Sequence, residues 1–501
     1  MMAQKRQDAV KYLGELVTGI DSHYAHLPVS GLALDSRKVA EGDVFLAYPS
    51  HSVVGGVDGR NFIDKAVAAG AVVVLVESDE AWVTVSDSKG IPVIPVDQLS
   101  RRVSAIADNF YDHPSHHIPV MGVTGTNGKT SCTQLMMQLL NGLHKRCGVI
   151  GTLGAGVDGQ LDKASNTTPD GISVQRYLSQ WCDKQVDAVA MEISSHGLEQ
   201  GRVAAIRFQL ALFTNLSRDH LDYHGSMQVY AAAKSKLFIM PDLQTAVINI
   251  DDPFSSTLID LLESDVELIR YSMQDSSAHF FVSDIDYHQK GVNATLHGLG
   301  ETVDLTSPLL GAFNLSNLLG VIASLVSVGS DVREILKAVP RLATVPGRME
   351  RISASSDITV VVDYAHTPDA LEQALIAMRL HCGGKLWCVF GCGGDRDHGK
   401  RQQMGAVAQR CSDHVVITSD NPRSESAHAI IDDILCGVDI PTEVQADRAA
   451  AIDFTIEHAK PGDCILIAGK GHEEYQHVGD QLLPFSDIKQ ARLALTRRGV
   501  D

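Results

Sequence analysis

The stretch VTGTNGKT, residues 123–130, combines residue types that can hold a triphosphate. Gly125 and Gly128 let the backbone come close to phosphate oxygens, and the N–H groups at the start of a following helix favour anions. The ammonium group of Lys129 would reach the β- and γ-phosphates, and the hydroxyl of Thr130 would bind Mg²⁺. The stretch therefore predicts a nucleotide-binding loop. Its candidate ATP-binding residues are Gly125, Thr126, Asn127, Gly128, Lys129, Thr130 and Ser131.

The residues on either side of this loop decide between a phosphate site and an ordinary glycine-rich turn. Val123 occupies the position where the general pattern has its first glycine, so the match is incomplete. The apolar run 118–123 before the loop is typical of a buried strand, and the apolar residues within 135–143 have helical spacing. Strand, loop and helix are the context that the motif requires, which favours nucleotide binding. The loop alone does not separate a motor, a switch, a kinase and a ligase.

Two further strand ends carry side chains that suit a metal ion. Glu192 lies at the end of an apolar run, where its carboxylate can serve as a second metal ligand. His220 follows another strand in TNLSRDHLDYHG, residues 214–225. A lone His is more often structural than a ligand, but His220 would lie at the same sheet edge as the phosphate loop, so we predict a metal role for it. The neighbouring Asp222 and His224 are expected only to shape the loop.

A third stretch, VVITSDNPRSE at 415–425, opens like a buried strand and ends in charged and turn-forming residues. Asn421 and Pro422 are a dipeptide typical of turns, so a plain loop is the simpler interpretation. The alternative is a pocket for a small molecule with both charges, because Asp420 can accept an ammonium group and Arg423 can bind a carboxylate. Neighbouring strands also end in polar, Gly-rich residues, at the edge where open α/β sheets bind ligands, which favours the pocket.

The order of strand and helix patterns predicts an α/β protein of three domains. Short strand-like runs with one helical stretch predict a small N-terminal α/β domain. Alternating strands and helices then predict a central ATP-binding domain with a phosphate loop and a parallel sheet. Regular alternation in the last part predicts a doubly wound, Rossmann-like domain that binds a ligand at the carboxyl ends of its strands. The predicted boundaries are 1–97, 98–343 and 344–501.

Composition limits the partners of the chain. Its 501 residues suit about three domains at roughly 150 residues each. With 61 acidic and 42 basic residues the net charge is −19, which argues against general binding to nucleic acid or an anionic membrane. There is no signal-peptide core, no window near the roughly 20 apolar residues of a membrane helix, and no CxxC pair among nine cysteines. We therefore expect a cytoplasmic protein with reduced thiols. We also expect it to be a monomer.

Together the motifs resemble the Mur ligase superfamily. The resemblance is carried by GTNGKT, NTTPD, MEISSHGL, RDHLDYHG, AAAKSKLF, GAFNLSNLLG, VPGRMERI, DYAHTPDAL, GCGGDRD, DNPRSE and AGKGHE. These motifs run in order from Gly125 to Glu473, about two thirds of the chain. Each piece alone is weak, but the ordered set is highly specific. Within the superfamily it is most similar to the MurE group, the UDP-MurNAc-tripeptide synthetases.

The resemblance implies an ATP-dependent ligase of cytoplasmic peptidoglycan precursor synthesis. ATP would phosphorylate the terminal carboxylate of UDP-MurNAc-L-Ala-D-Glu, and the amine of a diamino acid would attack the acyl phosphate, giving an amide, ADP and phosphate. Carboxylate, triphosphate and developing charge are all negative, so two Mg²⁺ ions, Lys129 and helix N-terminal amides would offset that charge. Separate domains for the nucleotide sugar, ATP and the amino acid imply that domain closure assembles the site.

The resemblance also assigns the catalytic residues by motif position. Thr130, Glu192 and His220 resemble the Mg²⁺ ligands. Lys234 resembles the family's carbamylated lysine, whose carbamate presents oxygen atoms where an ammonium group would repel Mg²⁺. Without the resemblance Lys234 would be a solvated helix residue, no better a candidate than Lys236. The catalytic candidates are Lys129, Glu192, His220 and Lys234.

Other positions resemble the family's ligand contacts. Outside the phosphate loop, the positions that resemble ATP contacts are Asn317, Arg348, Asp363 and His366. The alternative interpretation of these four residues is ordinary turn and capping chemistry. The positions that resemble UDP-MurNAc-peptide contacts are Leu34, Ser36, His51, Asn166, Thr167, Thr168, Ser194, Gln200 and Arg202. At His51 the sequence departs from the family, because YPSHSVVGGVDGR replaces a short Gly-containing turn.

The stretch DNPR would select the amino acid. MurE enzymes add meso-diaminopimelate or L-lysine, and diaminopimelate is lysine with a second carboxylate on its far carbon. Arg423, with Arg396, offers a planar fork for that carboxylate, while Asp420 and Glu473 could accept the ammonium group. A site built for a polar group rejects analogues that lack it by up to about 10⁴-fold. DNPR also matches the family's diaminopimelate signature, so we predict meso-diaminopimelate. The candidates are Arg396, Asp420, Asn421, Pro422, Arg423, Gly469 and Glu473.

Two alternatives stay open. Folylpolyglutamate synthetase shares the ATP-binding parts and also forms amides to an amino acid, but it lacks the uridine domain marked here by LALDSR and it lacks DNPR. The second alternative is a phosphate-loop protein without catalysis, in which ATP drives assembly or regulates a partner. ATP turnover that depends on a muropeptide would exclude the second alternative.

Overall fold

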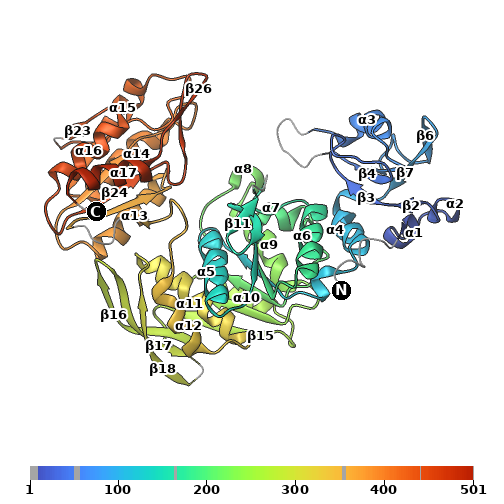
Figure 1. Ribbon diagram of the computed structural model, residues 1–501, viewed down its shortest axis with the longest axis horizontal. Helices are drawn as coiled ribbons and strands as arrows, with labels where there is room; N and C mark the ends of the chain where they lie inside the picture. The colour runs from blue at the N-terminus through green and yellow to red at the C-terminus, as the bar shows by residue number, and fades with distance from the viewer. Residues whose placement is uncertain are drawn as a thin grey trace. The chain divides into compact units, whose positions relative to one another are not determined.

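The computed structural model describes residues 10–49, 57–162, 166–298, 300–352, 357–440 and 442–499. His51 lies outside these residues. Contacts divide the chain into two compact units, Met1–Phe280 with Gly320–Val332 and Phe281–Leu319 with Arg333–Asp501 (Figure 1). The predicted boundary after residue 97 falls within the first unit and the one after residue 343 within the second, so both boundaries stay predictions.

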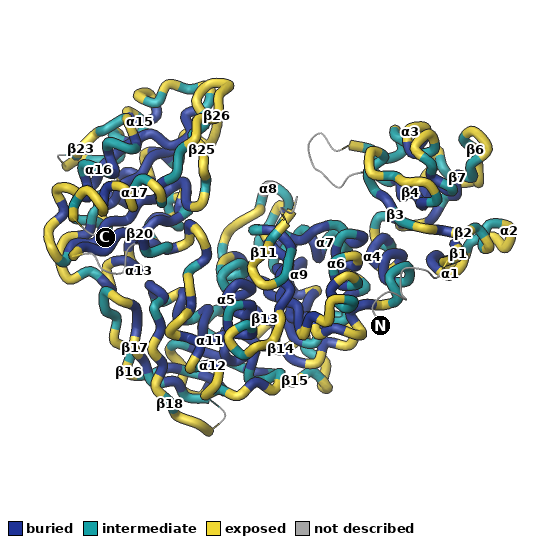
Figure 2. Tube along the Cα trace, in the orientation of Figure 1, coloured by how far each residue is buried: buried dark blue, intermediate teal, exposed yellow. Residues whose placement is uncertain are grey.

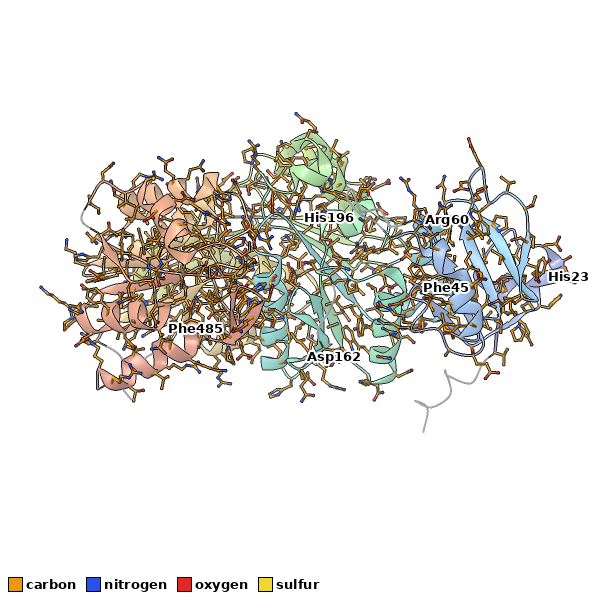
Figure 3. All side chains as sticks on the ribbon, turned by 90° about the horizontal axis from the view of Figure 1, so that it is seen from above. His23, Phe45, Arg60, Asp162, His196 and Phe485 are labelled. Atoms are coloured by element: carbon orange, nitrogen blue, oxygen red, sulfur yellow. The ribbon has the colours of Figure 1, made fainter. Side chains whose placement is uncertain are left out.

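The first unit begins with a mainly parallel sheet that has helices on both faces. Its elements are β1 (Lys11–Tyr12), α1 (Leu13–Leu16), α2 (Ser22–Ala25), β2 (Pro28–Val29), β3 (Gly31–Ala33), β4 (Asp43–Ala47), η1 (Gly59–Phe62), α3 (Ile63–Ala68), β5 (Val73–Glu77), β6 (Ser86–Ser88), β7 (Ile91–Val96) and α4 (Leu99–Phe110). The sheet order is β3-β4-β5-β7-β6, with β6 antiparallel. On β4, Leu46 packs with α1 and α4, whereas Phe45, which Figure 3 labels, packs with α3. The alternation of strand side chains therefore produces two cores.

A larger parallel sheet follows in the same unit. Its strands are β8 (Val120–Thr124), β9 (Cys147–Gly151), β10 (Gly154–Val157), β11 (Gln160–Asp162), β12 (Ala188–Glu192), β13 (Leu210–Phe213), β14 (Thr245–Asn249) and β15 (Glu267–Ser272). They lie in the order β11-β10-β9-β12-β8-β13-β14-β15, and β9, β12, β8, β13, β14 and β15 are parallel. The strands expected after the phosphate loop are confirmed. Their carboxyl ends meet at one edge, which is where ligands bind in open α/β sheets.

Helices connect and cover these strands. They are η2 (Pro114–His116), α5 (Lys129–Gly142), α6 (Gly171–Asp183), α7 (Ser195–Glu199), α8 (Leu221–His224), α9 (Met227–Ser235), η3 (Lys236–Ile239) and α10 (Ser255–Leu261). Leu178 and Trp181 of α6 share a core with Ile150 and Val189 of the sheet. The phosphate loop thus runs from β8, a strand with neighbours on both sides, directly into α5.

The second unit opens with an antiparallel meander that the sequence did not suggest. It consists of β16 (Phe280–His288), β17 (Gly291–Gly298) and β18 (Glu301–Ser307). The helices after it are α11 (Ala312–Ser327), α12 (Val332–Ala338) and η4 (Val339–Arg341). The chain passes between the two units within α11 and again at the start of α12.

The rest of the second unit is a doubly wound sheet, as predicted. Its strands are β19 (Glu350–Arg351), β20 (Thr359–Asp363), β21 (Leu386–Phe390), β22 (His414–Ile417), β23 (Glu443–Val444) and β24 (Cys464–Ala468). They lie in the order β19-β20-β24-β21-β22-β23, and all except β19 are parallel. The chain then forms a hairpin of β25 (Tyr475–Val478) and β26 (Gln481–Pro484).

Helices cover both faces of this sheet. They are α13 (Pro368–Leu380), α14 (Gly399–Cys411), α15 (Ala427–Leu435), α16 (Arg448–His458) and α17 (Asp487–Arg497). Leu466 of β24 shares a core with α13, α14 and α15, while its neighbour Ile465 shares a core with α16 and α17. Because both faces are buried, the strands are continuous apolar runs, which is why the sequence revealed them.

Two further structural findings bear on the sequence-based expectations. No helix in the described ranges is long and apolar enough to cross a bilayer. All nine cysteines are free thiols.

Candidate active site

The phosphate loop folds around its own lysine. The Lys129 ammonium group donates to the carbonyl oxygens of Gly125 and Thr126, each at 2.7 Å. Gly125 has φ +150°, and a Cβ there would lie 1.9 Å from the Thr214 hydroxyl oxygen, so only glycine fits. Gly128 has φ +90° at the start of α5. The two glycines thus allow a tight turn that leads into a helix N-terminus, the arrangement that favours phosphate.

The end of β13 fixes the shape of this loop. The Thr126 N–H donates to the Asn215 carbonyl at 2.8 Å, and the Asn127 N–H donates to the Asn215 side-chain oxygen at 2.9 Å. The Thr214 hydroxyl donates to the Asn127 carbonyl at 2.6 Å. These contacts hold the loop in place from the neighbouring strand.

Glu192 and Thr130, two of the predicted metal ligands, lie in direct contact. The Thr130 hydroxyl donates to the Glu192 carboxylate at 2.9 Å. That carboxylate also accepts the Thr152 N–H at 2.8 Å and the Thr152 hydroxyl at 3.1 Å. Glu192 is 1% exposed, and burial raises its pKa, while the Thr152 N–H bond and the charge of Lys129 act in the opposite direction. A buried carboxylate with so many donors presents oxygen atoms at the phosphate loop.

Lys234 extends from α9 to the same loop. It is 1% exposed, and its amino nitrogen donates to the Gly125 carbonyl at 2.7 Å, the same oxygen that Lys129 contacts. The nitrogen lies 4.5 Å from the centre of the Tyr230 ring. Burial, and then the charge of Lys129, lower the pKa of Lys234 well below its usual value. This environment disfavours the ammonium form and favours a neutral amine.

His220 lies at the N-terminus of α8 with a more exposed side chain. Its ring nitrogen is 3.5 Å from the Asp219 carboxylate, and its backbone has φ +52°. The ring of His196 packs edge-on against it, with centroids 4.9 Å apart; Figure 3 labels His196. The neighbouring His224 is buried and contacts the Ser195 hydroxyl at 3.0 Å, in keeping with a structural role.

The donor atoms at this edge suit Mg²⁺ only in part. Among the described residues, no group of three or more His, Cys, Asp or Glu side chains is arranged to hold a metal ion. Mg²⁺ prefers carboxylate and hydroxyl oxygens, and Glu192 and Thr130 provide both at 2.9 Å from each other. A carbamate on Lys234 would add further oxygens beside the loop. The residues therefore fit the ion if Lys234 is modified.

Several predicted peptide-binding residues form one hydrogen-bonded group beside Glu192. The Thr168 hydroxyl donates to the Glu192 carbonyl at 2.8 Å and accepts the Ser194 N–H at 2.9 Å. The Arg202 guanidinium donates to the Thr168 carbonyl at 2.7 Å and to the Gln200 side-chain oxygen at 3.0 Å. Gln200 in turn donates to the Tyr223 hydroxyl at 3.0 Å. The group links the end of β12 to α8 and orients Arg202.

The other predicted sugar and peptide contacts are less constrained. The Thr167 hydroxyl lies 3.1 Å from that of Thr152, and Asn166 is exposed. Leu34 and Ser36 are half-buried in the loop after β3.

All four predicted ATP contacts outside the loop belong to the second unit, whereas the phosphate loop belongs to the first. Asp363, at the end of β20, accepts the N–H groups of Met349 at 2.7 Å and Ala365 at 2.8 Å. Burial raises its pKa. The Arg348 guanidinium lies 5.2 Å from the centre of the Tyr364 ring.

The remaining two are His366 and Asn317. A ring nitrogen of His366 contacts the Tyr364 carbonyl at 2.8 Å. Asn317 is buried in α11. For Asp363, the observed bonds to the N–H groups of Met349 and Ala365 are those of a turn, which is the alternative interpretation.

The predicted amino-acid site contains a buried lysine that the sequence did not single out. Lys470 is 0% exposed, and its ammonium nitrogen lies 2.9 Å from the Asn421 side-chain oxygen and 3.0 Å from the Glu473 carboxylate. An Asp420 oxygen lies 4.0 Å from it. The Asn421 amide also donates to Glu473 at 2.8 Å. The structure thus brings Asp420, Asn421 and Glu473 together around a positive charge that belongs to the protein.

Arg423 lies at the same edge with a constrained backbone. It has φ +52°, and its guanidinium donates to the Gly394 carbonyl at 2.7 Å. Its side chain is half-buried. Because a guanidinium has five N–H donors, a bidentate contact with a carboxylate is still open to it. Arg396, the second candidate, is exposed, and its guanidinium contacts the Asp395 carbonyl at 3.4 Å.

Gly469 and Pro422 shape the space between these side chains. Gly469 has φ +118°, and a Cβ there would lie 2.5 Å from an Asp420 carboxylate oxygen. Pro422 is buried. A larger residue at 469 would displace Asp420, so the glycine is required by packing as well as by backbone conformation.

A second buried cation supports this edge from behind. Arg448 is paired with Asp487 at 2.7 Å, and both side chains are 0% exposed. Its guanidinium also donates to the carbonyls of Ser419 at 3.2 Å and Ala468 at 2.9 Å, the residues directly before Asp420 and Gly469. The charges of Arg448 and Lys470 oppose the burial that raises the pKa of Asp420. In the sequence, only the motif GKGH could have pointed to Lys470. Arg448 had no such signal, because a lone Arg in a helical pattern is usually solvated.

Comparison with known proteins agrees with this geometry. The Mur ligase middle domain matches residues 123–325, the Mur ligase glutamate ligase domain matches 347–471, and the catalytic domain of the Mur ligase family matches 28–111. The matched segments include the phosphate loop, the Glu192 strand and the DNPR stretch.

Relatives extend the similarity to nearly the whole chain. The UDP-N-acetylmuramoyl-L-alanyl-D-glutamate–2,6-diaminopimelate ligase of Pseudomonas aeruginosa is 49% identical over 475 residues, covering 94% of this chain and 95% of that protein. The enzyme of the same name from Coxiella burnetii is 43% identical over 492 residues, covering 97% and 99%. A solved structure of a ligase with this name is 34% identical, with a TM-score of 0.77, and covers 98% of this chain and 100% of that one. The chain therefore belongs to the Mur ligase family and, within it, to the group of the 2,6-diaminopimelate ligases.

Proposed function

We propose that the chain is an ATP-dependent ligase that joins meso-diaminopimelate to the D-Glu carboxylate of UDP-MurNAc-L-Ala-D-Glu. The reaction would proceed through an acyl phosphate and release ADP and phosphate. One observation supports the phosphoryl-transfer chemistry. Two buried side chains contact the phosphate loop: Glu192, which accepts a hydrogen bond from Thr130, and Lys234, whose pKa is lowered. The relatives named for this reaction support the choice of substrates.

The phosphate loop would bind ATP and offset its charge. The Lys129 ammonium group, now held by two loop carbonyls, would turn to the β- and γ-phosphates, and the N–H groups at the start of α5 would donate to phosphate oxygens. When bound at Thr130, Glu192, His220 and the modified Lys234, Mg²⁺ would supply Lewis-acid stabilisation of charge on the transferred phosphoryl group. Asn317, Arg348, Asp363 and His366 would hold the rest of ATP.

Lys234 would act as a carbamate. Its neutral amine nitrogen would attack the carbon of CO₂, forming an N–C bond and releasing one proton to solvent. The lowered pKa supports this step, because only the unprotonated amine is a nucleophile. Carbamate formation turns the Lys234 side chain into an anion. The positive charge of Lys129, which contacts the same carbonyl, would stabilise that anion.

The group around Arg202 would position the acceptor carboxylate. Arg202 is oriented by Gln200 and Thr168, and Thr168 bonds to the backbone of Glu192. This arrangement would place the peptide end of the nucleotide sugar beside the phosphate loop, with Ser194, Asn166 and Thr167 as further contacts. Leu34, Ser36 and His51 would contact the uridine end.

The edge around Asp420 would bind the amino acid. Asp420, Glu473 and Lys470 carry a summed charge of −1 when all are ionised, so one negative charge is left for a substrate ammonium group. Arg423, with Arg396, would bind the far carboxylate that lysine lacks. We further propose that the enzyme acts as a cytoplasmic monomer.

The test is phosphate release by the purified protein with ATP, Mg²⁺ and UDP-MurNAc-L-Ala-D-Glu. Parallel reactions contain meso-diaminopimelate, L-lysine or no amino acid. We expect release, together with a tripeptide product, only with diaminopimelate. Release with lysine would keep the ligase and overturn the role of Arg423. If the folded protein releases no phosphate in any reaction, the two alternative functions become favoured. The folate-type ligase would then be tested with folate and glutamate, and a negative result would leave the non-catalytic phosphate-loop protein.

A further inference from the structure

The hairpin β25–β26 lies directly after the strand and loop that carry Gly469 and Glu473. Its own surface is mostly exposed, with Leu482 at 61% and Leu483 at 44%. Figure 2 shows β26 in the colour of exposed residues. A two-stranded hairpin with so little burial is not stable on its own and adds little to the core. Its contacts with the rest of the unit therefore point to a different role.

Those contacts include the backbone of Arg423. The Arg423 N–H donates to the His477 carbonyl at 2.9 Å, and the Gly479 N–H donates to the Arg423 carbonyl at 2.7 Å. Together they form an isolated parallel bridge between Arg423 and Val478. Arg423 has φ +52°, a conformation that is costly for a residue with a side chain and persists only when its surroundings impose it. The hairpin supplies both backbone hydrogen bonds that impose it.

The hairpin also holds the three residues before Pro422. The Gln476 side-chain amide donates to the Ser419 hydroxyl at 2.8 Å and to the Asp420 carbonyl at 2.6 Å. The His477 N–H donates to the Asn421 side-chain oxygen at 2.9 Å. Gln476 thus bonds to one end of the SDNPR stretch, while the backbone of the same strand bonds to the other end. None of these hydrogen bonds contributes to the strand pairing within the hairpin, which runs from Tyr475 to Pro484.

We propose that the hairpin β25–β26 is a positioning element for amino-acid selection, and that Gln476 is its main positioning residue. It sets the turn that separates Asp420, at the ammonium end of the substrate, from Arg423, at the far carboxylate. This inference rests on the proposed function. Gln476 acts through Asp420 and Arg423 and is not a catalytic residue.

The variant Gln476→Ala tests the proposal in the phosphate-release assay. Loss of two hydrogen bonds to the turn raises the KM for meso-diaminopimelate about tenfold, because each such bond contributes roughly a factor of three. The KM values for ATP and for the UDP-MurNAc-dipeptide stay at the wild-type level. The preference for diaminopimelate over L-lysine falls, since the Asp420 end of the turn is no longer fixed relative to Arg423. A role in folding alone would lower the amount of active enzyme and leave all three KM values unchanged.

Gln481→Ala is the matched control. Gln481 is exposed on β26 of the same hairpin and pairs with Val478, so its removal tests the hairpin without touching the SDNPR stretch. We expect wild-type KM values for it. Gln476→Met, which keeps the side-chain shape but has no N–H donor, is the second variant if Gln476→Ala does not fold, and the same rise in KM is expected.

The outcomes separate this proposal from the proposed function. If the wild-type protein turns over diaminopimelate and both Gln476 variants match Gln481→Ala, the positioning role is overturned and the ligase stands. Equal rises in the KM for ATP and for diaminopimelate also overturn it, since the effect is then general. If the wild-type protein releases no phosphate with any amino acid, the proposed function fails and this inference falls with it.

Discussion

Two lysines are buried at the carboxyl ends of parallel strands, one in each unit, and their surroundings differ. Lys234 has a backbone carbonyl as its hydrogen-bond acceptor and shares it with another lysine, Lys129. Lys470 lies 3.0 Å from the Glu473 carboxylate, 2.9 Å from the Asn421 oxygen and 4.0 Å from Asp420. Both side chains are at most 1% exposed.

The difference separates two uses of the same side chain. An ammonium group that is buried beside another cation is destabilised relative to the amine, so Lys234 is suited to react. An ammonium group among carboxylates is stabilised as a charge, so Lys470 is suited to hold Glu473 and Asn421 in place. Burial alone therefore does not tell a reactive lysine from a structural one, whereas the charges around it do.

Substitution of Lys234 is expected to have the largest effect on activity. Lys234→Met removes the proposed carbamate and with it the charge stabilisation at the phosphoryl group, so kcat falls by about 10³-fold. The stability of the protein stays equal or rises, because a poorly solvated amine is replaced by an apolar group of similar size. Phosphate-release rates and thermal unfolding measure the two effects.

A carbon-13 NMR spectrum in labelled bicarbonate provides the control. The wild-type protein and Lys470→Met are expected to show a carbamate signal, and Lys234→Met is not. A signal that survives in Lys234→Met would assign the carbamate to another residue.

Arg448 extends the comparison to a second buried cation with a carboxylate partner. Arg448→Met leaves the Asp487 carboxylate buried without its partner, so the free energy of unfolding falls by about 4 kcal/mol. The double variant Arg448→Met/Asp487→Leu removes both charges and is expected to regain most of that stability. Urea unfolding measures both. A double variant no more stable than the single one would argue against an uncompensated charge as the cause.

Lys470 is expected to behave in the opposite way to Lys234. Lys470→Met leaves the negative charges of Glu473 and Asp420 unopposed, so the free energy of unfolding falls by about 3 kcal/mol. The KM for meso-diaminopimelate rises because Asn421 and Glu473 lose the group that orients them. If Lys234→Met and Lys470→Met changed stability in the same direction and by the same amount, the distinction between the two lysines would be wrong.

The smallest effect concerns the carboxylate that ends the SDNPRSE stretch. Hydrogen bonds from Arg401, and then from the Asp395 N–H, lower the pKa of Glu425 from 4.5 to about 2. Because the folded-state pKa is depressed, its contribution to stability is fully present above about pH 4.5 and is lost as the pH falls toward 2. The difference in melting temperature between the wild-type protein and Glu425→Gln should therefore shrink as the pH is lowered below 4.5. A difference that does not depend on pH would show that the charge of Glu425 is not what Arg401 binds.

The parallel sheets could be predicted from the sequence because they are buried on both faces. Runs such as CILIA, now β24, are continuously apolar and alternate with helical patterns. The hairpin β25–β26 could not, because YQHV and QLLP are exposed short strands without a clear apolar period. The Gly479–Asp480 pair between them was the available turn signal.

The candidate site could be predicted where a motif joins a residue type to a strand end. Glu192 and Thr130 lie far apart in the sequence, yet each was singled out, and they are in contact. Lys470, Arg448 and Gln476 were missed, since long polar side chains are usually exposed and only the fold shows which of them are buried or turned inward. The role of a buried lysine thus depends on the side chains around it in space, and a single sequence does not show which side chains those are.

The proposed ligase binds ATP at the phosphate loop and the amino acid around Arg423. The most direct test is the KM of Arg423→Ala for meso-diaminopimelate and for ATP, measured in the same phosphate-release assay with the wild-type protein beside it. We predict that the KM for diaminopimelate rises at least about tenfold, since a charge-assisted pair is lost, while the KM for ATP stays within about twofold. Equal changes in both KM values, or an unchanged preference for diaminopimelate over lysine, would contradict the assignment.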